Sequence, residues 1–145
     1  MISCTEFIPL YNELFKYIDN KAGHDAVVRY WEVIADRYVE KTLGTLVDEK
    51  GLAGAYEYWA RALNEEAADF IMKYDEKKEV LSIETRWCPS RGLLNSLKHI
   101  EPYYDYCGHC SVLYDHVLRK RGIEQQVDMS HIDEAACSEI RYYAK

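Results

Sequence analysis

The chain has 145 residues, of which 48% are hydrophobic and 30% are charged. These values are typical of a folded globular protein, and a chain of this length buries roughly two thirds of its unfolded surface without disulfides. The 18 Lys and Arg residues against 25 Asp and Glu residues give a net charge of −7, which argues against a nucleic-acid or anionic-membrane surface. The apolar runs are far shorter than the ~18 residues of a membrane span, and the first residues lack a signal-peptide pattern. We therefore expect a cytoplasmic protein without a nucleic-acid or membrane partner.

The first half of the sequence predicts helices. A first helix is expected over residues 5–18. A longer helix is expected over residues 25–48, where apolar side chains recur at helical spacing and form one stripe: Val27, Trp31, Ile34, Tyr38 and Leu46. Gly51 closes that segment, and residues 52–67 predict a third helix.

The second half predicts a sheet, because the hydrophobic period changes to two near residue 69. The predicted elements are a hairpin of strands 69–74 and 79–88, helices 91–97 and 107–120, and strands 123–129 and 136–143. Together these elements predict an α+β fold in which N-terminal helices pack on an antiparallel sheet of about four strands with an inserted helix. We expect a single domain over residues 1–145, with a helical part (1–67) and a part that holds the sheet and the cysteine cluster (68–145).

Cysteine is the most suggestive residue type. Four of the five cysteines lie in the last 58 residues with the spacing C-x18-C-x2-C-x26-C: Cys88, Cys107, Cys110 and Cys137. An odd number of cysteines in an intracellular chain indicates thiols, metal ligands or redox chemistry rather than a disulfide framework. One of the four ends a strand, two open a helix and the last opens a strand, and these places can meet at one end of the sheet. Four thiolates there could bind a zinc or iron ion, and three could leave one position open for chemistry.

Two other interpretations of the cysteines stay open. Free cysteines are often buried as small hydrophobic residues. The segment Cys107-Gly108-His109-Cys110 also has the spacing of a thioredoxin-like dithiol, although no strand precedes it. If the cysteines bind a metal or react, we expect the N-terminus of the predicted helix to lower the pKa of the thiols next to it.

The helix 107–120 places Cys107, Ser111 and Asp115 along one edge, because these residues are four apart. Asp115 could then act as a base, as a metal ligand or as the anchor of a cationic substrate group. The alternative is an ordinary ion pair between Asp115 and Arg119 at i+4. His109 is expected on the opposite side of the helix.

Tyrosines and histidines complete the candidate site. Tyr106, Ser111 and Tyr114 are predicted to contact a substrate, since tyrosine offers an apolar body with a polar tip. Two loop histidines, His99 and His131, are alternatives to one thiolate as a metal ligand. His24 is a weaker candidate that precedes a helix.

The order of these features over residues 69–143 is itself distinctive. A hairpin ends in Arg86-Trp87-Cys88-Pro89, a helix carries Cys107 and Cys110 followed by Asp115, and Cys137 opens a last strand with the sequence Glu139-Ile140-Arg141-Tyr142-Tyr143. This order resembles the L-2-amino-thiazoline-4-carboxylic acid hydrolase family. The resemblance implies that the site consists of Cys88, Cys137, Asp115 and one of the two helix cysteines.

The leading hypothesis is a hydrolase that acts on a non-peptide C–N bond of a small cyclic amidine or amide. Cys107 or Cys110 would attack the electrophilic carbon, or a cysteine-bound metal would activate water, and Asp115 would hold the amino group or move a proton. One alternative is a non-enzymatic metal- or ligand-binding module with a four-cysteine site, and another is a CxxC thiol–disulfide protein. The partner expected in each case is a small molecule, and a homodimer is left open.

Overall fold

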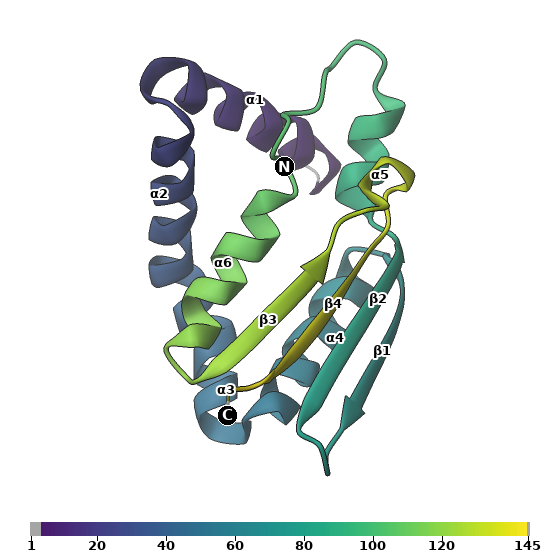
Figure 1. Ribbon diagram of the computed structural model, residues 1–145. Helices are drawn as coiled ribbons and strands as arrows, with labels where there is room; N and C mark the ends of the chain where they lie inside the picture. Colours follow the sequence, from purple (N-terminus) through teal and green to yellow (C-terminus); the bar gives the residue numbers. More distant parts are fainter. Residues whose placement is uncertain (1–3, 145) are drawn as a thin grey trace.

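The computed structural model describes residues 4–144, with side chains from residue 6 onward. It confirms the predicted α+β fold (Figure 1). The first half of the chain consists of α1 (Cys4–Ala22), α2 (His24–Ile34), the π-helical segment η1 (Ala35–Gly44), α3 (Thr45–Lys50) and α4 (Leu52–Glu65).

The second half forms a four-stranded sheet with two helices between its hairpins. Its elements are β1 (Asp69–Asp75), β2 (Val80–Trp87), α5 (Pro89–Ser96), α6 (Gly108–Arg119), β3 (Ile123–Asp128), a short 3-10 turn η2 (Ile132–Glu134) and β4 (Cys137–Tyr143). The strand order is β1-β2-β4-β3, and every neighbouring pair is antiparallel. The predicted hairpin, inserted helix and last two strands are therefore confirmed, with boundaries that shift by a few residues.

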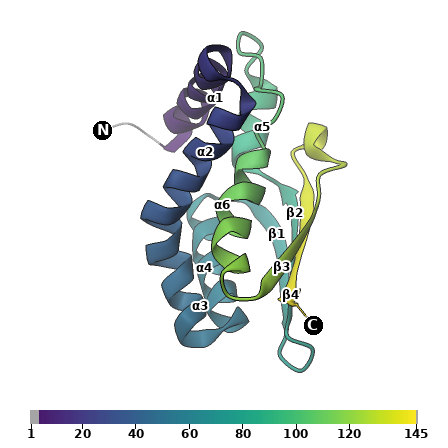
Figure 2. The ribbon, with the colours of Figure 1, turned by 60° about the vertical axis from the view of Figure 1, so that its left-hand side comes forward.

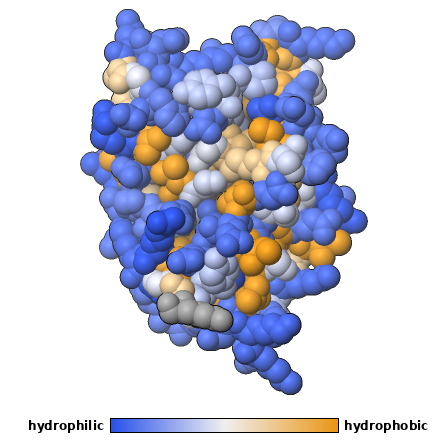
Figure 3. Space-filling model, viewed as in Figure 1, coloured by the Kyte–Doolittle hydropathy of each residue, from blue (hydrophilic) through white to orange (hydrophobic). Residues whose placement is uncertain are grey.

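The molecule has two layers. Figure 2 shows the helices gathered on one side of the sheet, while the other face of the sheet carries no helix. Within the described residues, none of the helices is long and apolar enough to cross a membrane. In the view of Figure 3, hydrophobic residues form separate patches on a mostly hydrophilic surface.

The predicted helix 25–48 is one continuous rod, but its middle is η1 rather than α-helix. The predicted apolar stripe is right for Val27 and Trp31 and wrong for Tyr38, which is 63% exposed. Beyond Trp31 the buried residues recur four apart, at Ala35, Val39, Leu43 and Val47, because the π-helical turn changes which side chains face inward. Gly44 at the end of η1 is buried, and a Cβ there would lie 2.8 Å from the guanidinium of Arg121. That guanidinium pairs with Glu40 of η1 and Asp48 of α3, each at 2.7 Å, and so ties the rod to the end of α6.

Two clusters of buried side chains make up the core. The larger lies between the sheet and η1, α3, α4 and α6, and includes Leu43, Trp59 and Leu81. The smaller joins α1 and α2 to α5 and the loop before α6, and includes Phe15 and Trp31. Two of the cavities described below have lining residues from both clusters.

Candidate functional site: a cysteine cavity beside an aromatic cleft

Strand pairing brings two of the cysteines to the same end of the sheet. Cys137 opens β4 opposite Thr85 of β2, and Cys88 follows β2 directly. The backbone N–H of Cys88 donates to the carbonyl oxygen of Ala135 at 2.7 Å, which holds the start of α5 against the turn before β4. Because α6 ends next to the start of β3 at the far end, its own N-terminus lies at the end where Cys88 and Cys137 meet (Figure 1).

The four predicted cysteines line one small cavity of about 130 Å³ between α4, α5, α6 and the sheet. Cys88, Cys107, Cys110 and Cys137 are all free, half-buried thiols. The walls between them come from Glu66, Arg91, Tyr106, His109, Tyr114 and Glu139. The structure thus brings together all four cysteines that the sequence pattern grouped, and we call this space the cysteine cavity.

Burial raises the pKa of each of these thiols. The pKa reaches about 11 for Cys107, although the nearby Arg91 offsets part of the rise, and about 11 for Cys137. The pKa of Cys110 lies well above its ordinary value because burial is reinforced by the neighbouring sulfur of Cys88. The expectation that the helix N-terminus lowers these pKa values is wrong, because the loss of water around sulfur outweighs the helix dipole. At neutral pH the thiols are protonated, and a nucleophile among them needs a base.

Such a base lies next to Cys110. The thiol of Cys110 is 3.4 Å from Nε2 of His109. The other ring nitrogen, Nδ1, contacts the carbonyl oxygen of Tyr106. A carbonyl can only accept a hydrogen bond, so the proton of the neutral imidazole sits on Nδ1 and Nε2 is left to accept the proton of the thiol. Burial also lowers the pKa of His109, which keeps the ring neutral.

Sequence reasoning missed His109, because neighbouring residues on a helix point about 100° apart. The ring nevertheless turns back toward Cys110, since it is packed among three aromatic rings: Phe15 at 5.9 Å, Trp31 at 6.4 Å and Tyr106 at 5.0 Å between centroids. The only signal in the sequence was the adjacency of the two residues in the segment Cys-Gly-His-Cys.

The remaining predicted residues divide into two groups. Tyr106 and Tyr114 line the cysteine cavity as expected. Asp115 and Ser111 do not: Asp115 pairs with Nε of Arg119 at 2.5 Å, the alternative that the i+4 spacing allows, and the carbonyl oxygen of Ser111 accepts from Gln125 at 3.4 Å. The structure therefore puts His109, rather than Asp115, beside a candidate nucleophile.

The other histidines lie elsewhere. Nε2 of His24 is 2.7 Å from Oδ2 of Asp105, which fastens the loop before α6 to the start of α2. His131 lies at the opposite face of the sheet, with Nδ1 3.8 Å from Glu134, and His99 is exposed in a turn after α5. None of the three lines the cysteine cavity.

The structure does not support the predicted four-cysteine metal site. Among the residues that the structure describes, no group of three or more His, Cys, Asp or Glu side chains has an arrangement that could hold a metal ion. The four thiols share the cavity wall without forming a coordination shell there. The cavity as it stands does not fit a four-cysteine metal centre.

Two further cavities adjoin the cysteine cavity. One, of about 360 Å³, runs between α1, α2, η1, α4 and α6 and is walled mostly by aromatic rings. The other, of about 330 Å³, opens beside Phe7 of α1 and Pro89 of α5. All three share Glu66, Tyr106 and His109. We call the cavity of about 360 Å³ the aromatic cleft, and it meets the cysteine cavity at the His109 ring.

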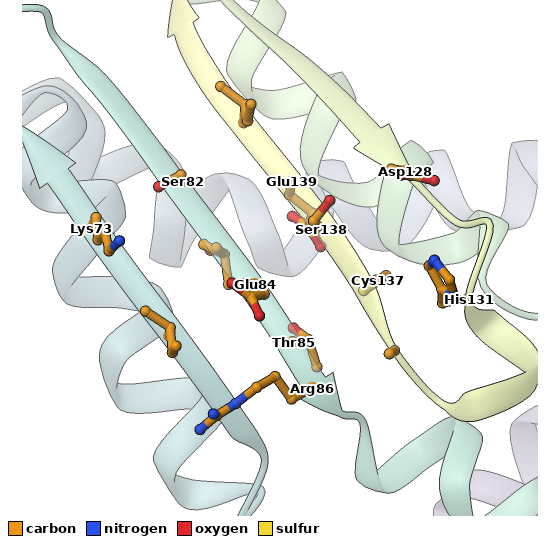
Figure 4. Close-up of a pocket in the computed structure, with 14 residues that line it drawn as sticks. Lys73, Ser82, Glu84, Thr85, Arg86, Asp128, His131, Cys137, Ser138 and Glu139 are labelled. Atoms are coloured by element: carbon orange, nitrogen blue, oxygen red, sulfur yellow. The ribbon is translucent and has the colours of Figure 1, made fainter.

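A shallow hollow lies on the open face of the sheet. It has a volume of about 430 Å³. Figure 4 shows Lys73, Glu84, Arg86 and Ser138 in front of the strands, with the helices behind the sheet. Charges of both signs alternate there, and Arg86 is already paired with Asp69 at 2.7 Å. The chemistry described above lies on the other face of the sheet.

No family model, no curated protein and no solved structure matches this chain. The resemblance to the aminothiazoline hydrolase family therefore stays a prediction from the sequence.

Proposed function

We propose that the protein is a hydrolase for a small cyclic amidine or amide, with Cys110 as the nucleophile and His109 as its general base. The observation that carries the proposal is the 3.4 Å contact between Cys110 Sγ and His109 Nε2, with the imidazole oriented by the Tyr106 carbonyl. A nucleophile, a base within reach and a group that orients the base form the arrangement common to cysteine-based acyl transfer.

The reaction would take two steps. Sγ of Cys110 bonds to the amidine carbon while its proton moves to Nε2 of His109, and that proton passes to the nitrogen whose bond to the carbon breaks. Water then adds to the same carbon, the carbon–sulfur bond breaks, and one proton of the water returns to the sulfur. The net change is the hydrolysis of one C–N bond by one water molecule.

The remaining walls suit a polar substrate. Arg91 supplies the one Lys or Arg side chain in the described lining of the cysteine cavity. Its Nε donates to the carbonyl oxygen of Ile132 at 3.3 Å and its Nη2 lies 3.4 Å from Asp133, whose side chain is 94% exposed, so an acidic group such as the carboxylate of an aminothiazoline would compete with this weak, exposed pair. Glu139 in the same wall contacts Arg141, so its charge is compensated from within the protein.

The test is turnover of 2-amino-thiazoline-4-carboxylate under reducing conditions, followed by liquid chromatography and mass spectrometry. We expect Cys110→Ser and His109→Gln to lower kcat at least a hundredfold, which is the scale of general-base catalysis. Asp115→Asn is the matched control, and it should stay within twofold of the parent. Normal turnover by Cys110→Ser, or loss of turnover in Asp115→Asn alone, would contradict the proposal.

A ligand-binding module without catalysis is the second candidate. It is favoured by the neutral state of the four thiols, since a cavity of protonated thiols can hold a small ligand without reacting with it. This candidate predicts saturable binding of the aminothiazoline with no product and no mass added to Cys110.

A further inference from the structure

The wall of the aromatic cleft includes a tryptophan whose indole N–H has no hydrogen-bond partner among the described residues. Trp31 lines the cleft and is only 1% exposed, yet its indole Nε1 has no hydrogen-bond partner within the described part of the chain. Buried indole N–H groups normally find an acceptor. Because this nitrogen has less than 1 Å² of accessible surface, it is covered by neighbouring atoms, and Trp31 contributes its ring rather than an open donor to the wall of the cleft.

The size of the cleft suits a small organic molecule. Its volume of about 360 Å³ falls in the range of small-molecule sites, and its walls are the rings of Phe15, Trp31, Tyr38, Tyr58 and Tyr114. The cysteine cavity, at about 130 Å³, holds the volume of only about four water molecules and so admits little more than a reacting group. A substrate of ordinary size would need the cleft for the rest of its body.

The charge of the cleft indicates the sign of its ligand. Two carboxylates, Glu65 and Glu66, lie in its wall, and no Lys or Arg is among its described lining residues. Glu66 is exposed at the rim of the cleft and forms no ion pair with any described residue, and partial loss of water together with the neighbouring Glu65 raises its pKa. An unpaired carboxylate beside the negative faces of aromatic rings attracts a cation.

We propose that the aromatic cleft binds a flat organic cation, whose charge lies between Glu66 and the tyrosine faces and whose body packs among the aromatic rings of the wall, Trp31 included. The cleft meets the cysteine cavity at His109, Tyr106 and Glu66. If the protein is the hydrolase proposed above, its substrate is an amidine or amide that carries a planar, cationic group. This assignment of the substrate class rests on the proposed hydrolase function.

The test uses two soluble probes of nearly the same shape. The 1-methylnicotinamide cation is flat and has an amide acceptor, and 3-methylbenzamide is its neutral counterpart. By calorimetry we expect the cation to bind at least tenfold more tightly than the neutral probe. Glu66→Gln should reduce that preference to less than twofold. Glu57→Gln removes the same charge from an exposed site on α4 that pairs with Lys50, and it should keep the preference.

The site of binding is checked by the indole ¹⁵N–¹H resonances of the three tryptophans. The Trp31 resonance, assigned with Trp31→Phe, should shift on addition of the cation, whereas that of Trp87, which is 44% exposed, should not. Equal affinity for both probes, or binding without a shift at Trp31, would overturn the proposal. Cys110→Ser should bind the cation like the parent, so a failure of the hydrolase mechanism leaves this result unaffected and the two proposals fail separately.

Discussion

His109 Nε2 lies 3.4 Å from the thiol of Cys110, although the two residues are adjacent on α6. Adjacent helical side chains do not normally face each other. The contact exists because the Tyr106 carbonyl and the surrounding rings hold the imidazole turned back along the helix. The pair therefore depends on packing between α1, α2 and α6, and its reactivity should respond to that packing.

The first prediction concerns the reactivity of Cys110. Because its pKa lies well above the ordinary value, the thiol needs His109 to accept its proton. His109→Gln should slow alkylation of Cys110 by iodoacetamide at pH 7.5 at least tenfold. The rate at each cysteine is measured by mass spectrometry of digested protein, and Cys137 serves as the internal control with an unchanged rate. Equal rates at Cys110 in the parent and the variant would rule out His109 as its base.

The second prediction concerns alkaline stability. Cys107 and Cys137 keep their protons up to a pKa of about 11 in the fold, whereas unfolded cysteine loses its proton near 8.5. Between these values the unfolded state binds fewer protons, so the free energy of unfolding should fall as pH rises from about 8.5 to 11. Urea unfolding in the presence of reductant measures the slope. Cys107→Ser should make the slope shallower, and an unchanged slope in that variant would show that its thiol is not buried as described.

The third prediction concerns Arg141, which is fully buried under Trp59. Its guanidinium carbon lies 3.6 Å from the Trp59 ring, its Nε donates to Gln125 at 3.0 Å, and it contacts Glu139. Replacing Arg141 with Met leaves the carboxylate of Glu139 buried without a partner, which typically costs about 3–5 kcal/mol.

Two comparisons make the Arg141 experiment decisive. Adding Glu139→Gln to Arg141→Met should recover a large part of the lost free energy of unfolding, because the uncompensated charge is removed. Arg86→Met, which breaks only an exposed pair with Asp69, should cost less than about 1 kcal/mol. If the double variant is no more stable than Arg141→Met, the loss comes from packing against Trp59 rather than from charge.

The fourth prediction concerns the contact between the first turn of α4 and α3. Gly54 is buried, and a Cβ at this position would overlap the backbone carbonyl of Leu46. Gly54→Ala should lower the free energy of unfolding by about 1–3 kcal/mol or more, because backbone cannot move aside as a side chain can. Ala53→Ser, one residue earlier and exposed, should stay within about 0.5 kcal/mol. Thermal unfolding that is the same for Gly54→Ala and Ala53→Ser would contradict the close approach of α3 and α4.

Local patterns in the sequence were sufficient to predict the elements and much of their order. The alternation in Leu81, Ile83 and Thr85 predicted β2, and the residues Cys88-Pro89 marked its end, because apolar side chains that alternate fill one face of a strand and proline cannot extend it. The same patterns put cysteines at a strand end, at a helix start and at a second strand start. Antiparallel pairing brings such places together, which is why the shared cavity could be predicted.

Only the tertiary structure decided the chemistry of that cavity. The pKa of Cys110, the orientation of His109 and the pairing of Asp115 depend on burial and on contacts with residues from α1, α2 and the sheet. The aromatic cleft likewise combines Phe15, Trp31 and Tyr114, which are distant in sequence. A periodic pattern records which face of an element is buried, whereas desolvation and ring orientation depend on what the neighbouring elements place against that face.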